Sequence, residues 1–302
     1  MILTVTLNPA VDKTCHIGEL MLGQVNRLQS VKSIAGGKGV NVTKVLRQFG
    51  YPVVAMGFVG GYSGSLIEDR LEAMGATCQF THIGGETRVS TNVLAENGYV
   101  TEILEPGPEI TEDEIRQFTE EYEKQVKKAK VVVLSGSVPQ GVPQDIYAEL
   151  ITIAVSNGCK VFLDTSGEAL KEGVKAVPHM IKPNRKEMEY LVGRKLITTQ
   201  DIIEEAEKLL ERGIETVVIS LGSKGFLHVD KEGVIEQPAY KVKTVNTVAC
   251  GDCLVTSYCM GSLEGWERME QAKYAAVLSA TNAATAVSAE ISMDIYNELL
   301  ML

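Results

Sequence analysis

The 302-residue sequence lacks any stretch close to the roughly 20 apolar residues that a helix needs to cross a bilayer. Its first residues, MILTVTLNPAVD, contain no basic leader and no long apolar segment, and they alternate like a first β-strand. Neither a membrane-spanning segment nor a secretory signal is predicted. We therefore expect a cytoplasmic protein with no membrane partner.

Clustered basic residues and paired cysteines are also scarce. The 29 Lys and Arg residues are outnumbered by 39 Asp and Glu residues, which gives a net charge of −10. The densest basic run, Lys127, Lys128 and Lys130, lies in a Glu-rich helical segment, so the sequence argues against a nucleic-acid partner. The six cysteines are mostly scattered, which is typical of reduced thiols and not of a disulfide framework.

Two common phosphate-binding motifs are absent. In AGGKGVNV, residues 35–42, Lys38 is followed by Gly39 where a Walker A loop has Ser or Thr. The glycines of GFVGGYSG, residues 57–64, do not follow the first predicted strand and lack the spacing of a dinucleotide-binding turn. The sequence therefore argues against a nicotinamide-dependent oxidoreductase.

What the sequence does have is a regular alternation of short apolar runs and amphipathic segments. Predicted strands cover residues 2–7, 53–58, 131–135, 161–164, 180–181, 216–220 and 226–229. Predicted helices cover residues 39–49, 65–74, 112–128, 145–156, 185–192 and 199–212, the last with Thr199 as N-cap, and the chain from residue 250 onward is expected to be helical. This order predicts an α/β fold with a mostly parallel central sheet between helices.

Two segments break the alternation. Residues 87–104 read as two strands joined by Asn97-Gly98, a pair that suits a type I′ hairpin turn. Residues 12–35 show weak strand-like alternation. We expect these segments to form a small β-sheet standing off the main body, which serves either as a lid over a cleft or as an edge that pairs with another subunit.

Two segments near the N-terminus could bind a ligand. Adjacent glycines in AGGKGVNV allow close backbone approach, the following helix offers free N–H groups, and Lys38 supplies a cation. Asp12 in NPAVD follows the first strand, where α/β sheets bind ligands, and its carboxylate could accept hydrogen bonds from sugar hydroxyls. Ordinary turns, one with a surface lysine, are the alternative interpretation of both.

The segment NTVACGDCL, residues 246–254, turns from an extended chain into a helix. The N–H groups of Ala249, Cys250 and Gly251 would converge there and stabilise the charge of a migrating phosphoryl group. Asp252 would stand beside them and could accept a proton from an attacking hydroxyl. The alternative is an acidic residue that merely favours the helix dipole.

Other polar residues have two interpretations each. Arg88 in GETR, and with a weaker case Arg27 in VNRL, could clamp a phosphate or lie on the surface. Asn184 and Glu187 in IKPNRKEMEYL fit a capping box or the hydration shell of Mg²⁺.

The turn ISLGSKG and the cysteines of the 246–254 segment also leave two interpretations open. Ser220, Gly222 and Gly225 could line a nucleotide or form a hairpin turn. Cys250 and Cys253, a Cys-x-x-Cys pair at a helix start, could form a redox pair with a lowered thiol pKa, or simply fill space.

The whole chain resembles the ribokinase-like, PfkB-type sugar kinases. AGGKGVNVTKVLRQFG resembles the N-terminal signature of that family, and NTVACGDCLVTSY its C-terminal signature. LTVTLNPAVD, GETR, EILEPGPEIT, LSGSVPQGVP and LDTSGEAL resemble the branch that phosphorylates phosphorylated ketohexoses, 1-phosphofructokinase and tagatose-6-phosphate kinase. The resemblance implies one kinase domain over residues 1–302, a three-layer sandwich with an inserted β-lid from about residues 12–35 and 87–104 that often makes dimer contacts.

The resemblance also implies residue roles. Asp252 would be the general base, and the main chain of Ala249, Cys250 and Gly251 the anion hole. The residues that would hold the sugar and its phosphate are Asp12, Gly36, Gly37, Lys38, Asn41, Arg88, Arg27 and Ser137. The residues that would hold Mg·ATP are Asn184, Glu187, Ser220, Gly222, Gly225 and Asn282, with Glu187 reaching Mg²⁺ through water.

The chain departs from the family at Ala249 and Cys250, which replace the usual Gly and Ala. A positive φ at Ala249 would cost on the order of 1 kcal/mol, so we expect activity to survive. The sequence therefore predicts an ATP- and Mg²⁺-dependent kinase that makes a 1,6-bisphosphate, with tagatose 6-phosphate slightly favoured over fructose 1-phosphate and fructose 6-phosphate also open. The alternative is a non-catalytic sugar-phosphate sensor with a degenerate anion hole.

Overall fold

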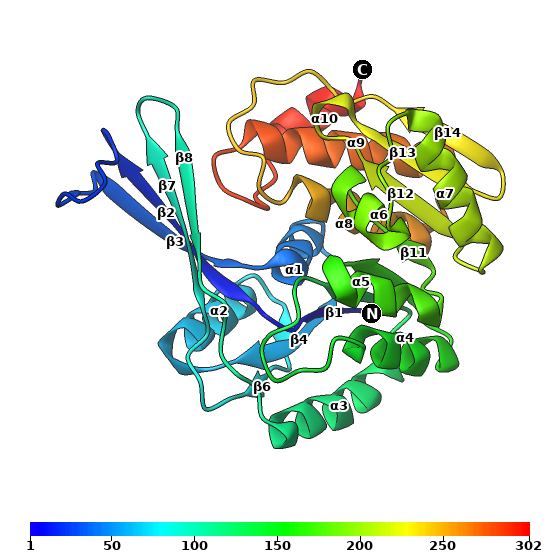
Figure 1. Ribbon diagram of the computed structural model, residues 1–302, viewed down its shortest axis with the longest axis horizontal. Coiled ribbons are helices and arrows are strands. Elements are labelled where there is room, and N and C mark those ends of the chain that lie inside the picture. The colour runs from blue at the N-terminus through cyan, green and yellow to red at the C-terminus, as the bar shows by residue number, and fades with distance from the viewer.

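The computed structural model describes all residues, 1–302, and contains two sheets (Figure 1). The larger one has the strand order β14-β13-β12-β11-β10-β9-β1-β4-β5, with β6 also paired to β4. Its strands are β1 (Ile2–Thr6), β4 (Val53–Val59), β5 (Thr77–Cys78), β6 (Thr81–His82), β9 (Val131–Ser135), β10 (Lys160–Asp164), β11 (Met180–Ile181), β12 (Thr216–Ser220), β13 (Phe226–Asp230) and β14 (Gly233–Gln237). All pairs are parallel except β12–β13 and β13–β14.

Helices cover both faces of this sheet. They are α1 (Lys38–Gln48), α2 (Gly61–Ala73), α3 (Glu112–Val126), α4 (Ile146–Ser156), α5 (Gly167–Gly173), α6 (Arg185–Val192), α7 (Thr199–Glu211), α8 (Cys250–Glu264), α9 (Arg268–Ala284) and α10 (Met293–Leu300). Alternate strand residues face opposite sides: Val132 and Leu134 pack with α3 to α7, whereas Val131 and Val133 pack with α1, α8, α9 and α10. The apolar strands of the middle are therefore buried on both sides, as parallel sheets require.

The smaller sheet, called the lid below, has the order β3-β2-β7-β8 and stands away from the main body (Figure 1). Its strands are β2 (Ala10–Ile17), β3 (Ser30–Gly36), β7 (Val89–Ala95) and β8 (Val100–Leu104). Helix α2 anchors its base, because Val11 and Ala35 of the lid share an apolar cluster with Ile67 and Leu71. The base of the lid leads directly into α1.

Most predicted elements are confirmed to within a few residues, including the strands at 131–135, 180–181 and 216–220. The type I′ turn is wrong: Asn97 does not have a positive φ, and Gly98, with φ of 88°, closes a three-residue loop in which Ala95 N–H donates to Tyr99. Thr198, not Thr199, caps α7, because Asp201 completes its capping box. The short strands β5 and β6 and the edge strand β14 were not predicted.

Candidate active site

The turn between β3 and α1 requires glycine for its shape. Gly37, immediately before α1, has φ of 104°. A Cβ atom on Gly36 would overlap the Asp12 carboxylate, and one on Gly39 would overlap the Thr6 hydroxyl. The turn therefore lies against the carboxyl end of β1 and brings Asp12 next to the start of α1.

A second turn leads into α8. Ala249 precedes the helix in the left-handed conformation, with φ of 68° and ψ of 0°, so the positive φ considered from the sequence is present. The N–H groups of Ala249 and Gly251 have no backbone partner, and that of Cys250 makes only a long 3.4 Å bond to Thr247. These groups are free to bind an anion at the helix N-terminus.

Asp252, in the first turn of α8, links the two turns. Its side chain is buried, and its Oδ2 accepts a 2.9 Å hydrogen bond from Nδ2 of Asn41 in α1. Burial and the neighbouring Asp164 raise the pKa of Asp252 to about 6, although Lys38, Asn41 and Lys182 oppose the shift. A carboxylate with such a pKa is suited to accept a proton near neutral pH.

Two charged residues beside Asp252 were missed by the sequence analysis. Asp164 ends β10, and Lys182 follows β11; Oδ1 of Asp164 lies 2.8 Å from Nζ of Lys38 and 3.3 Å from Nζ of Lys182. Oδ2 of Asp164 is buried without a partner. Their positions at the carboxyl ends of adjacent parallel strands could have identified them as site residues from the sequence.

Burial lowers the pKa of Lys38, but the carboxylates of Asp164, Asp252 and Glu187 more than compensate and raise it above its ordinary value. Lys38 therefore stays charged at the centre of a cluster of acidic groups. Such a fixed cation can receive a phosphate oxygen.

Two of the predicted sugar-side residues, Arg88 and Ser137, meet at Asn8. The Arg88 guanidinium donates to the carbonyl of Asn8 at 3.2 and 3.1 Å, and the Asn8 amide donates to Ser137 at 3.3 Å. Burial raises the pKa of Asp12, although Lys44 and Arg88 lower it. Arg27 is not part of this group: it is exposed in the loop between β2 and β3, at the end of the lid remote from Gly36.

A cavity of about 480 Å³ adjoins the α8 turn. The predicted residues Ser220, Gly222 and Gly225 line it, together with Cys250 and Gly251. Small side chains of α9 also line it: Ala276, Ser279, Ala280 and Ala283. The sequence assigned these residues only to a helix.

Asn282 does not line this cavity. Its side chain is fully buried, donates to the carbonyl of Val248 at 2.7 Å and to the Cys250 sulfur at 3.3 Å, and accepts from the Ala289 N–H at 2.8 Å. It therefore holds the segment before α8 instead of facing a ligand.

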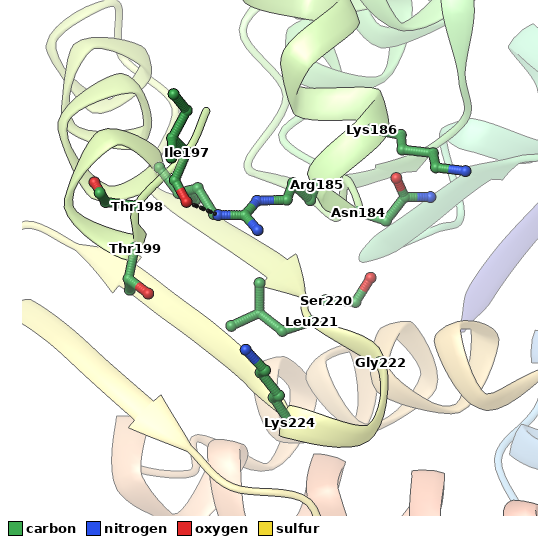
Figure 2. A pocket seen from close by; sticks show the side chains of 11 residues that line it. Asn184, Arg185, Lys186, Ile197, Thr198, Thr199, Ser220, Leu221, Gly222 and Lys224 are labelled. Carbon is green, nitrogen blue, oxygen red and sulfur yellow. Dashed lines mark hydrogen bonds between the residues drawn. The ribbon is translucent and has the colours of Figure 1, made fainter. Parts of the chain in front are cut away.

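A second cavity, of about 640 Å³, lies on the other side of Ser220. Figure 2 shows Asn184 and Ser220 at one side of it and Thr198 and Thr199 at the other. Asn184 and Glu187 form the predicted capping box: Asn184 accepts from the Glu187 N–H at 2.9 Å, and Glu187 Oε2 accepts from the Asn184 N–H at 2.7 Å. Oε1 of Glu187 has no protein partner.

The two cysteines of the α8 turn are free thiols, and Cys253 is fully buried. Burial raises the pKa of both Cys250 and Cys253, opposite to the lowered pKa that a redox pair at a helix start would have. Their burial therefore favours packing as their role.

Comparison with known proteins shows the family of the chain. A model of the pfkB family of carbohydrate kinases matches residues 4–293. Phosphofructokinase-2 from Escherichia coli, solved with fructose-6-phosphate, is 28% identical with a TM-score of 0.89 and covers 99% of each chain; it has also been solved as a tetrameric inhibited form. No helix has the length and apolar character of a bilayer span.

Two other solved structures are similar over nearly the whole chain. A protein from Thermotoga maritima described as a possible 1-phosphofructokinase is 29% identical with a TM-score of 0.89, and covers 99% of this chain and 97% of its own. Ribokinase from Arabidopsis thaliana, 21% identical with a TM-score of 0.82 over 100% of this chain and 98% of its own, shows that the fold is ribokinase-like.

Proposed function

The chain belongs to the pfkB family of carbohydrate kinases and transfers phosphate to a sugar hydroxyl, and from this premise we propose that its acceptor is a ketohexose monophosphate and its product a 1,6-bisphosphate. The observation that carries the proposal is Asp252, buried beside the free N–H groups of Ala249 and Gly251 and hydrogen-bonded to Asn41. The proposed base and anion site thus adjoin Asn41, a residue proposed to hold the sugar.

The Asp252 carboxylate takes the proton of the attacking hydroxyl, so that the oxygen can bond to the terminal phosphorus of ATP while ADP leaves. The N–H groups of the α8 turn stabilise the charge on the transferred group. Burial of the cluster excludes water, which would otherwise compete with the sugar as acceptor.

ATP use follows from the family, and we propose the 480 Å³ cavity lined by Ser220, Gly222 and Gly225 as its base and ribose site. Glu187 would hold Mg²⁺ through water, because its Oε1 is free of the capping box and its charge acts on Lys38. The chain offers no group of three His, Cys, Asp or Glu side chains for a metal, which fits an ion bound mainly by water and phosphates. The ion neutralises phosphate charge.

The phosphate already on the sugar is proposed to lie against Lys38, Arg88 and Ser137, and the sugar hydroxyls against Asp12 and Asn41. Arg27 would take part only if the lid moved toward the site, or if a second subunit placed the end of its own lid there. Among acceptors we place tagatose 6-phosphate first and fructose 1-phosphate next. The similarity to phosphofructokinases keeps fructose 6-phosphate as the third.

The test is an ADP-release assay with the three sugar phosphates side by side, with Asp252→Asn as the control. Turnover of one or more of them that is lost in the variant supports the proposal. Absence of turnover with all three defeats it, and binding of a sugar phosphate without any ATP consumption would establish the sensor instead.

We also propose that two copies of the chain pair through the lid. Exposed apolar residues gather there: Met21, Leu22, Val25, Leu28, Val31, Tyr99, Val100, Ile103 and Leu104. Patches of this kind mark interaction surfaces, and the similar Escherichia coli enzyme is oligomeric. Ile103→Glu should dissociate the oligomer in light-scattering measurements. Val155→Glu, the same kind of change at an exposed position of α4, should leave it intact. The proposal is contradicted if both variants are monomeric or if both remain oligomeric.

A further inference from the structure

Lys44 is a buried lysine that no role described so far uses. It lies one turn after Asn41 in α1 and is 8% exposed. Its Nζ donates to the carbonyl of Ser288 at 2.8 Å, to the carbonyl of Ala35 at 3.2 Å and to Oδ1 of Asn41 at 3.4 Å. Each proton of the ammonium therefore has an acceptor, and none of the acceptors is a carboxylate.

The bond to Asn41 bears on the proposed base. The Asn41 amide presents Oδ1 to the Lys44 ammonium and Nδ2 to the Asp252 carboxylate, 2.9 Å away. The reversed amide would place an acceptor against the carboxylate and a donor against the ammonium, so both contacts would become repulsive. Lys44 thus selects the orientation in which Asn41 donates to Asp252.

The bond to Ser288 bears on the anion site. Oγ of Ser288 accepts from Nδ2 of Asn246 at 3.0 Å, and Oδ1 of Asn246 accepts from the Val248 N–H at 2.9 Å. Val248 directly precedes the left-handed Ala249. A continuous chain of bonds therefore runs from Lys44 to the turn that carries the free N–H groups.

We infer that Lys44 is a positioning residue for the reaction proposed above, on which this inference rests: its ammonium orients Asn41 toward Asp252 and ties α1 to the turn before α8. It acts through its neighbours and does not itself touch the reacting atoms. Losing it should disturb both the base and the anion site, because one of its bonds leads to each.

The charge of Lys44 makes the role testable by pH. Four groups face the ammonium: Asp12 from β2, Asp252 and Cys253 from α8, and Glu290 from the segment after α9. Burial lowers the pKa of Lys44 to about 8, although these four groups raise it. Because the ammonium is the active form, activity should fall as the pH rises through this value.

The experiment compares three variants. Lys44→Met removes the charge and keeps the chain length, and Lys44→Arg keeps the charge. Gln48→Met is the matched control, because Gln48 lies one turn later on α1 and bonds Ala289 and Ile291 of the same segment at 2.8 and 2.9 Å without touching Asn41.

We expect Lys44→Met to lower kcat by about ten- to a hundredfold, the range that a small misplacement of reacting groups produces, and to lack the alkaline fall. Lys44→Arg should keep most of the activity and hold it above the pH at which the wild type declines. Gln48→Met should keep the wild-type kcat and pH profile.

A carboxyl NMR titration of Asp252, assigned by its absence in Asp252→Asn, gives a readout that does not need turnover. Lys44→Met should raise the pKa of Asp252, because a nearby cation and an oriented donor are lost. If the wild type phosphorylates no sugar but this shift is seen, the proposed function fails and the coupling stands. An unchanged pKa, or equal kcat losses in Lys44→Met and Gln48→Met with no change in pH profile, would overturn the inference.

Discussion

The turns before α1 and α8 both reach a positive φ at a helix start, and they do so by different means. Gly37 of the first has φ of 104°, and an added Cβ would come within 3.1 Å of the Thr6 side chain and 3.2 Å of the Pro9 backbone. Ala249 of the second has φ of 68° and carries a side chain. The second turn is held instead by hydrogen bonds at Val248, whose carbonyl accepts from Asn282 and whose N–H donates to Asn246.

A positive φ is stable either at glycine, which adopts it without strain, or at another residue whose surroundings enforce it. In the first turn the requirement lies in the turn residue itself. In the second it lies in Asn282, 33 positions beyond Ala249. The Asn282 side chain donates to the Val248 carbonyl and accepts from the Ala289 N–H, and Ala289 also has a positive φ, of 58°. Sensitivity to substitution should therefore fall on different residues in the two turns.

The largest effect is expected from the proposed base, which only the second turn carries. Asp252→Asn should lower kcat by about 10²- to 10⁴-fold because the proton acceptor is lost, while the sugar KM, set mainly at the first turn, changes little. Steady-state kinetics with the accepted sugar phosphate measures both. A variant with nearly normal kcat would move the base elsewhere and remove the chemical difference between the turns.

Mild acid should change the charge of Asp252 at the second turn but not that of Lys38 at the first. Lys38 stays protonated throughout, whereas Asp252, with a pKa of about 6, loses its charge in mild acid, so kcat/KM should fall about tenfold per unit below that pH.

Acid should lower the activity through Asp252 but raise the contribution of Asp252 to folding stability. Its pKa is raised in the folded state, so its contribution to stability is lost as the pH rises from its ordinary value of 3.8 to about 6. Asp252→Asn should therefore gain Tm relative to the wild type at pH 8 but not at pH 4. A gain independent of pH would contradict this.

Removing Asn282 tests whether the second turn depends on its surroundings. Asn282→Ala leaves the buried Ala289 N–H and the carbonyl of the exposed Val248 without their partner. The unpaired buried N–H should cost about 1–3 kcal/mol of unfolding free energy, and kcat should fall as the turn relaxes. Denaturant titration measures the loss. Asn157→Ala, at an exposed asparagine, is the control; equal losses would show that Asn282 is not a brace.

Gly37→Ala tests the first turn. Gly37, with φ of 104° and ψ of 147°, has a backbone conformation that other residues rarely adopt, which should cost an alanine on the order of 1–3 kcal/mol, and the tight contacts with Thr6 and Pro9 add to the strain. We expect a lower Tm and a higher sugar KM, because the turn must shift away from β1. The same substitution at Gly193, which has the milder left-handed conformation with φ of 72° and ψ of 16° and open space around it, is the control and should cost less.

The smallest effect is expected for Ala249→Gly. Relief of about 1 kcal/mol of strain is offset by the greater freedom of glycine in the unfolded chain, roughly 0.5–1 kcal/mol, so Tm should rise slightly or stay unchanged. Calorimetry of this variant beside Gly37→Ala completes the comparison. A loss as large as that of Gly37→Ala would mean that both turns follow the same rule.

The sequence predicted what local patterns specify. Apolar runs located the strands of the parallel sheet, and the turns containing Lys38 and Asp252 were recognised because glycine and small residues cluster there. Asp164, Lys182 and Lys44 were missed, since their significance comes from strands and helices that meet only in the fold. Asn282 was predicted to border a base, but its partners are two backbone segments whose proximity no periodicity reveals.

The central place of β1 has a consequence for how the chain acquires its activity. This first strand lies between β4 and β9, so the middle of the sheet cannot close before residues 131–135 have left the ribosome. The Asn41–Asp252 bond spans 211 positions and forms later still. During synthesis, the N-terminal half must therefore wait, with β1 unpaired on one side, and the ability to transfer phosphate is among the last properties to emerge.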